Sequence, residues 1–386
     1  MGKTSEATQG YFNIDELIEE FPDARYYFIL SGRSTGKTYS CIKRSIRESY
    51  EGKGIFAYVR RYKDSISQGQ LQDLLSPHNK YLEELSGGQY NHIGYWRNRW
   101  YMDYVDPETG ERKHRNTAKP LGISCAISTW ETSKGSDVGE AYNGFKNIIF
   151  DEALSKGGLY LKDEFSKFKN VISSLIRDRA EQDTKIYLLA NPVSKWSSEY
   201  FDNLGITPKM LDEQGKTTLI TYPDSNLQTV FTYLSNAMLQ NDKQQGVYDT
   251  YFAFSNSKMK SLSITEGIWE LDDAQHLPSD IYNESENKLT TYICFASKIY
   301  ALEVLKHTPT GIYYMFYRPA KEVKKGCYYY TLAPEINKFN ICEPAGEHPV
   351  NKVISRIYDL GQVYYSDNTT ADAIHGFYNA GMQIKR

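Results

Sequence analysis

A loop rich in glycine and hydroxyl side chains contains the residues best suited to chemistry. It runs from Ser31 to Thr38 and ends in Gly36, Lys37 and Thr38. The backbone N–H groups of such a loop surround a β-phosphate, while Lys37 reaches the β and γ oxygens and the Thr38 hydroxyl binds Mg²⁺. Gly36 lets the backbone approach the anion closely. We therefore expect a nucleoside triphosphate here. Its expected contacts are Gly32, Arg33, Ser34, Thr35, Gly36, Lys37 and Thr38.

The segments on either side of this loop have the patterns of a strand and a helix. Residues 26–30 are a run of strand-forming side chains, and residues 38–50 carry apolar side chains near helical spacing. A helix that begins at Lys37 would add its positive dipole end to the bound anion. The usual loop pattern has glycine at the position of Ser31, so a plain turn between strand and helix is the alternative.

An apolar run that ends in two carboxylates is the second candidate element. Residues 147–152 read Asn-Ile-Ile-Phe-Asp-Glu, the pattern of a parallel strand buried on both faces whose carboxyl end meets a ligand. Asp151 would bind Mg²⁺. Glu152 would act as general base for the attacking water, because that role needs a carboxylate about one water from the γ-phosphorus and not bound to the metal. The alternative is an ordinary strand with a polar end.

A third strand pattern, residues 185–190, is followed by Asn191 and Pro192. The proline ends the strand, and the Asn191 amide would then lie between the γ-phosphate and the rest of the protein. In that place it would sense whether the phosphate is present. The alternative is an asparagine that favours a turn after a strand.

Taken together and in this order, these elements resemble those of the large-terminase DNA-packaging ATPases. They are most similar to the short packaging ATPases of small protein-primed tailed phages. The resemblance covers roughly residues 25–205. The residues that carry it are the loop with Arg33, the string Tyr58-Val59-Arg60-Arg61-Tyr62-Lys63, the segment Ser128-Thr129-Trp130-Glu131 with Lys134, the strand end Ile149-Phe150-Asp151-Glu152, and Leu189-Ala190-Asn191-Pro192.

The resemblance implies roles for three further cations. Phosphoryl transfer needs positive charge at the equatorial oxygens, and a neighbouring subunit can supply it. Arg177 is expected to act in this way on the ATP of the next subunit. Lys134 is expected to make a second contact in trans, and Lys63 a contact on the phosphate side in cis. For each, the alternative is a solvated surface charge.

The same resemblance implies partners. These are double-stranded DNA, further copies of the chain in a ring, a pentamer by resemblance, the portal or connector of the capsid, and in some systems a packaging RNA. Two other functions stay open from the sequence: a helicase-like remodelling ATPase with the same core, and a virion structural protein that binds nucleotide without hydrolysing it. An active nuclease is a third.

Composition sets bounds on the environment of the chain. The 386 residues allow two domains, each with a core. The five cysteines are odd in number and lack metal-ligand spacing, which indicates a reducing compartment and no structural zinc. No apolar run reaches the roughly 18 residues of a membrane span. We therefore expect no membrane partner and, in a phage, a location in the host cytoplasm with transient binding at the capsid portal vertex.

The net charge of −3 is low for a protein that binds DNA. A translocating motor must release the backbone repeatedly, and each neutralised phosphate tightens binding, so local basic clusters suffice. Candidates are Arg97 and Arg99 beside a tryptophan hairpin, residues 112–115, and Lys195. Ordinary solubility charge is the alternative.

Strand and turn patterns divide the chain into three parts. Residues 1–225 are expected to form a RecA-like ASCE P-loop ATPase domain of the α/β class. Residues 226–288 are polar, include a helical pattern over 227–240, and are expected to form a linker or helical subdomain. Residues 289–386 are expected to form a small α+β domain of the RNase H-like type.

The C-terminal domain is expected to be a vestigial nuclease. Two-metal cleavage needs an aspartate on the first strand and two further carboxylates. The expected first strand, residues 291–297, has no acidic residue, although Asp359, Asp367 and Asp372 follow. We therefore expect a nuclease fold without its metals.

Overall fold

Two compact units form the computed structural model of this chain. The first comprises Met1–Leu154, Asp163–Pro192 and Glu199–Ile268, and the second Ser155–Lys162, Val193–Ser198 and Trp269–Arg386. The structure describes residues 10–115, 120–130, 144–155, 160–176, 183–193, 198–234, 274–295, 298–332, 335–342 and 349–384, with the backbone alone for 113–115 and 379–384.

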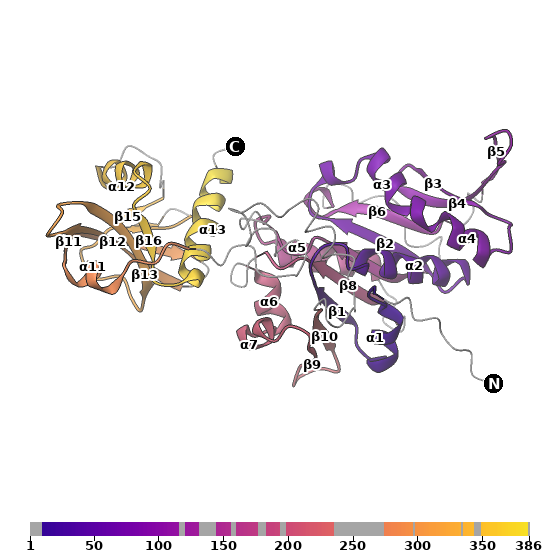
Figure 1. Cartoon of the computed structure of the whole chain (residues 1–386), viewed down its shortest axis with the longest axis horizontal. Helices are drawn as coiled ribbons and strands as arrows, with labels where there is room; N and C mark the ends of the chain where they lie inside the picture. The colour runs from indigo at the N-terminus through magenta and orange to yellow at the C-terminus, as the bar shows by residue number, and fades with distance from the viewer. Residues whose placement is uncertain are drawn as a thin grey trace. The chain divides into compact units, whose positions relative to one another are not determined.

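A 10-stranded sheet organises the first unit (Figure 1). Its strands run in the order β3-β4-β6-β2-β7-β8-β1-β10-β9, and β5 pairs with β4. The six from β6 to β10 are parallel, whereas β3, β4 and β9 pair antiparallel at the edges. The strands are β1 (Tyr26–Leu30), β2 (Ile55–Arg60), β3 (His92–Trp96), β4 (Arg99–Val105), β5 (Arg112–Arg115), β6 (Gly122–Ala126), β7 (Phe145–Asp151), β8 (Lys185–Ala190), β9 (Thr217–Thr221) and β10 (Gln228–Tyr233).

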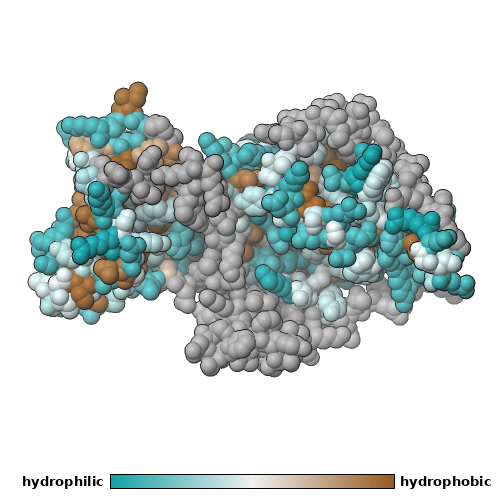
Figure 2. Space-filling model, turned by 90° about the horizontal axis from the view of Figure 1, so that it is seen from above, coloured by the Kyte–Doolittle hydropathy of each residue, from teal (hydrophilic) through white to brown (hydrophobic). Residues whose placement is uncertain are grey.

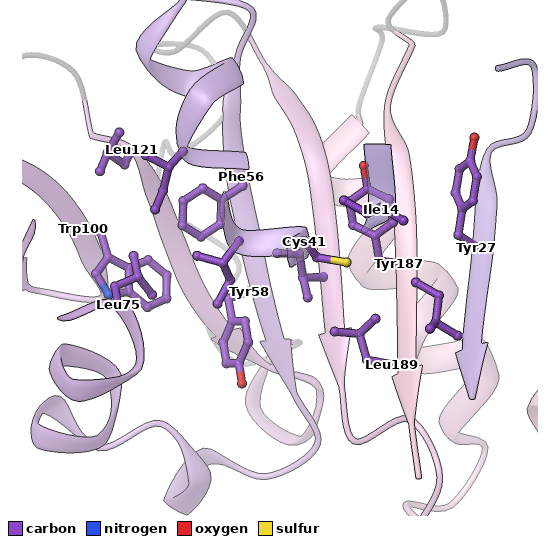
Figure 3. Close-up of a cluster of buried hydrophobic side chains, with 14 of the residues drawn as sticks. Ile14, Tyr27, Cys41, Phe56, Tyr58, Leu75, Trp100, Leu121, Tyr187 and Leu189 are labelled. Carbon is purple, nitrogen blue, oxygen red and sulfur yellow. The ribbon is translucent and has the colours of Figure 1, made fainter. Parts of the chain in front are cut away.

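Helices cover both faces of this sheet. Because successive strand residues point to opposite faces, the Tyr27 ring packs with Ile14, whereas the Phe28 ring contacts Phe201 at 5.6 Å. Figure 3 shows the first of these faces, where Cys41 from α2 lies among the side chains of the strands. That face carries α1 (Ile14–Glu20), α2 (Lys37–Tyr50), α3 (Gln68–Leu75) and α4 (Asn79–Leu85); the other carries α5 (Glu164–Ile176) and α6 (Glu199–Leu204), and α7 (Pro208–Asp212) precedes β9.

The order β7-β8-β1 is the feature that matters for the site. One additional strand, β8, lies between the strand before the loop and the acidic strand. Leu30 is opposite Ala190, and Leu189 is opposite Asp151. The loop, Asn191 and Asp151 therefore leave the sheet at one edge, where the carboxyl ends of parallel strands meet ligands. The predicted α/β fold of this part is confirmed.

The helix predicted over 227–240 is wrong where the structure describes it. Residues 228–233 form β10, which pairs in parallel with β1 and antiparallel with β9. This run contains Thr229, Val230, Phe231 and Thr232, whose branched or aromatic side chains fit a buried strand. The first sheet thus extends to Tyr233.

The second unit contains a six-stranded sheet in the order β15-β14-β11-β12-β13-β16. The first three strands along the chain, β11, β12 and β13, pair antiparallel with their neighbours. In contrast, β14 is parallel to β11 and β15 is parallel to β14. Strands followed by helices agree with the α+β composition predicted for this part of the chain. The elements are α11 (Ser279–Asn283), β11 (Ser285–Phe295), β12 (Lys298–His307), β13 (Tyr313–Ala320), β14 (Tyr329–Tyr330), β15 (Asn340–Ile341), α12 (Pro349–Asp359), β16 (Val363–Tyr365) and α13 (Asn368–Ile384).

Two acidic residues of this unit have contacts that are structural in character. The first strand begins earlier than predicted and contains Glu286, which is exposed and pairs with Lys288. Asp367 caps α13, since its carboxylate accepts the Thr370 backbone N–H at 2.7 Å. Among the residues that the structure describes, no group of three His, Cys, Asp or Glu side chains is placed to hold a metal ion.

The surface of the described residues is mainly hydrophilic. Figure 2 shows this on one face, where brown apolar patches are small and separate. Within the described part of the chain, no helix has both the length and the apolar composition for crossing a bilayer.

Gly122 tests the packing of the sheet. It lies opposite Phe56 on β2 and Trp100 on β4, whose rings stack at 5.4 Å. A Cβ on Gly122 would be 2.7 Å from the buried Phe56 ring. We expect Gly122→Ala to lower the free energy of unfolding by about 1–3 kcal/mol, as overpacked cores do. Urea denaturation measures this, and equal stability of the variant would contradict it. Gly69→Ala on α3, where a Cβ meets nothing within 4 Å, is the matched control without loss.

Candidate functional site

The loop after β1 has the backbone that anion binding requires. Ser34 and Gly36 have φ values of 59° and 86°. A Cβ at Gly36 would lie 3.2 Å from the Tyr11 side chain, so this position needs glycine for both conformation and space. Ser31, where the usual pattern has glycine, does not have positive φ. A serine is therefore tolerated there.

Lys37 is the centre of the loop. Its Nζ donates to Ser31 Oγ and the Gly32 carbonyl, both at 3.1 Å, and to Asn191 Oδ1 at 2.8 Å. Burial lowers the pKa of this ammonium group to about 8. The Ser31 hydroxyl also bonds to Thr35 Oγ1 at 2.7 Å and so helps to fix the loop. The structure thus brings Asn191 to the loop lysine, from a strand far away in sequence.

Thr38 and Asp151, the two residues predicted to bind Mg²⁺, lie next to each other. The Thr38 hydroxyl lies 3.4 Å from Asp151 Oδ1, and the Tyr58 hydroxyl donates to the other carboxylate oxygen at 2.7 Å. Burial raises the pKa of Tyr58 well above its ordinary value, so the phenol stays a donor. Two adjacent protein oxygens fit Mg²⁺, which keeps several waters and takes further oxygens from phosphate.

Glu152, the predicted general base, is held by a neighbouring cation. Its Oε2 lies 2.7 Å from Arg60 Nη2, and its backbone has φ of 60°, which is uncommon for a residue with a side chain. The side chain is 61% exposed, so water reaches it. A water beside a γ-phosphate would bind at the other carboxylate oxygen or would replace Arg60.

A buried network holds the peptide that carries Glu152. The Arg61 guanidinium donates to the carbonyls of Glu152 and Ala153 at 3.1 and 2.9 Å. Its Nε donates to Glu164 at 2.7 Å, and the Tyr200 hydroxyl donates to the same carboxylate at 2.9 Å. Glu164 is fully buried and begins α5. Arg61 therefore ties the unusual backbone at Glu152 to a helix on the other face of the sheet.

The sequence predictions did not assign roles to Tyr58, Arg60, Arg61 or Glu164. The first three lie in the string that carried the family resemblance. The strand period of two places Tyr58 and Arg60 on one face of β2, and continuing that period to Arg61, the residue after the strand, would place it on the other. That alternation was the available signal. Glu164 gave none, because one acidic residue before a helix is ordinary.

The remaining predicted site residues have different outcomes. Lys63 begins a short 3₁₀ helix, Lys63–Ser65, after β2. Its contact with a nucleotide phosphate stays a prediction. Lys134, Arg177 and Lys195 lie outside the residues that the structure describes.

Glu164→Gln tests the buried network. Removing one charge leaves the Arg61 guanidinium buried without its carboxylate, which typically costs roughly 3–5 kcal/mol of unfolding free energy. Chemical denaturation measures the loss. Glu84→Gln is the matched control, because Glu84 faces Lys80 at 4.0 Å on the surface and such pairs contribute less than about 1 kcal/mol. Equal losses in the two variants would contradict a supporting role for Glu164.

Comparisons with known proteins agree with the fold and with the family resemblance. No protein-family model matches the chain. A "DNA packaging protein" of Bacillus phage B103 is 25% identical over 202 residues, which are 51% of this chain. The chain spans about half, 54%, of the length of that relative.

Two solved structures match nearly the whole chain in fold. The DNA packaging motor of Phi-28 has a TM-score of 0.54 and 15% identity, over 97% of this chain and 98% of that chain. The genome packaging motor assembly of bacteriophage Phi-29 has a TM-score of 0.56 and 16% identity, over 96% and 99%. The resemblance inferred from the motifs is therefore confirmed: this chain is similar to DNA-packaging proteins of phages.

Proposed function

We propose that this chain is the ATPase subunit of a motor that drives double-stranded DNA into a preformed capsid. The observation that carries the proposal is the convergence of Lys37, Thr38, Asp151, Glu152 and Asn191 at one edge of the parallel sheet. Similarity to phage packaging motors in sequence and in fold supports the choice of DNA as the substrate that is moved.

Each side chain has a role that its surroundings suit. The loop N–H groups and Lys37 would hold the β- and γ-phosphates. Thr38 and Asp151 would hold Mg²⁺, which neutralises charge on the phosphates when it is bound. Glu152 would orient the attacking water. Asn191, already bonded to Lys37 at 2.8 Å, would exchange that bond for the γ-phosphate and report its loss to β8.

The proposed partners follow from the same similarity. They are DNA, neighbouring copies in a ring, a pentamer by resemblance, and a capsid portal, with a packaging RNA as a further candidate. Arg177 follows α5 directly in the sequence and would complete the site of the next subunit. Lys134 would make a second contact across that boundary.

Glu152→Gln separates the motor from a protein that only binds nucleotide. The amide cannot accept a proton from water, so we expect ATP turnover to fall by about 10²–10⁴-fold while ATP affinity is kept. A phosphate-release assay measures the turnover, and equilibrium binding of a fluorescent ATP analogue measures the affinity. Lys37→Ala should lose affinity as well. Unchanged turnover in Glu152→Gln would exclude its role as base.

Mixing two inactive variants tests Arg177. Arg177→Ala subunits keep the phosphate loop, and Lys37→Ala subunits keep Arg177. If the arginine acts across the subunit boundary, mixed rings regain part of the ATPase rate, because a competent loop then faces a competent arginine. Titration of one variant into the other with phosphate release as the readout shows this. A flat titration, with mixed rings demonstrated by mass photometry, would place the arginine in cis or outside catalysis.

A further inference from the structure

A hollow of about 650 Å³ lies outside the phosphate site, at the carboxyl end of β6. Its walls come from β6, the turn between β3 and β4, and the segment after β2. We call it the basic hollow; the wall residues used below are Lys63, Asp64, Arg97, Arg99 and Trp130. Three strands, β2, β7 and β8, separate β6 from β1, which leads into the phosphate loop.

The charge of the basic hollow favours an anion. Lys63, Arg97 and Arg99 line it, against one lining carboxylate, that of Asp64. Trp130 also lines the hollow, and its indole N–H is buried and has no acceptor among the described residues.

Arg97, in the hairpin turn at the rim, has a left-handed backbone conformation that is unfavourable for arginine. Arg97 and Asn98 have φ values of 49° and 61°, as two-residue hairpin turns require, and asparagine and glycine are the residues favoured there. The Arg97 guanidinium lies 4.3 Å from the centre of the Trp96 ring, and Trp96 is 43% exposed. The ring fixes the direction of the guanidinium at the surface. The fold does not require arginine at this turn, where asparagine or glycine would be less strained. The strained backbone at Arg97 therefore indicates that the arginine side chain has a function.

We propose that the basic hollow binds backbone phosphates of the double-stranded DNA that the motor moves. The inference rests on the proposed function. Guanidinium groups suit phosphate oxygens, and backbone contacts supply affinity without reading sequence, as a motor that moves any sequence requires. Lys63 would then serve DNA and not the nucleotide of its own subunit.

Arg97→Asn is the decisive variant because it separates charge from folding. Asparagine suits the left-handed backbone, so the unfolding free energy should be kept or raised. Binding of a labelled 30-base-pair duplex should weaken on the order of 5- to 10-fold near physiological salt, and the slope of log K against log salt should fall by about one. Fluorescence anisotropy over a salt series measures both.

Three controls sharpen the test. Arg97→Lys keeps the charge and should keep most of the affinity, and Lys80→Gln, at a side chain 86% exposed on α4, should bind DNA like the wild type. ATP turnover without DNA should be unchanged in Arg97→Asn. Wild-type DNA affinity and salt slope in Arg97→Asn would overturn the inference, and so would a raised KM for ATP with DNA binding intact, which would make the hollow a nucleotide site.

Failure of the inference can be told apart from failure of the proposed function. Loss of duplex binding in Arg97→Asn supports the inference only if the wild-type chain hydrolyses ATP. If the chain hydrolyses ATP and binds duplex DNA without sequence preference, but Arg97→Asn binds as tightly as the wild type, the inference is overturned and the proposed function stands. Preferential, Arg97-dependent binding of a matched RNA duplex would also overturn it.

Discussion

The parallel pairing of β1, β8 and β7 is the constraint on which the site depends. It places the end of β1 opposite the end of β8, and Leu189 opposite Asp151. A shift of one residue in any of these strands would turn its polar end toward the opposite face of the sheet. The fully buried apolar side chains of the three strands prevent such a shift, because helices cover both faces. The core thus sets the positions of the reacting groups.

Charge compensation is the second requirement of the site. Lys37 is buried, and its ammonium group donates hydrogen bonds to oxygens of the loop and of Asn191. Two successive arginines at the end of β2 act on Glu152: Arg60, the last residue of the strand, pairs with its carboxylate, and Arg61, the next residue, donates to its carbonyl. The proposed base is therefore fixed in its backbone but exchangeable in its side chain. This combination suits a group that must act only when a phosphate and a water are in place.

Local sequence patterns predicted much of this arrangement. The strand, loop and helix around Lys37 have strong signals, since apolar periodicity changes at a glycine, and the acidic strand is a continuous apolar run. The partners of these groups had weaker signals, because Glu164 and Arg61 are far apart in sequence and meet only through the fold. Residues 228–233 were mistaken for a helix since polar neighbours obscured a short strand whose position depends on pairing with β1. Roles at Arg177 and Lys134 rest on resemblance.

The central claim is that a triphosphate binds beside Lys37 and is cleaved by a water that Glu152 orients. The most direct measurement is a single-turnover assay of purified wild-type protein, assembled and supplied with magnesium, that follows both retention and cleavage of γ-labelled ATP. The account predicts a stable complex whose label is released as phosphate. A protein that neither retains nor cleaves ATP under these conditions would contradict it.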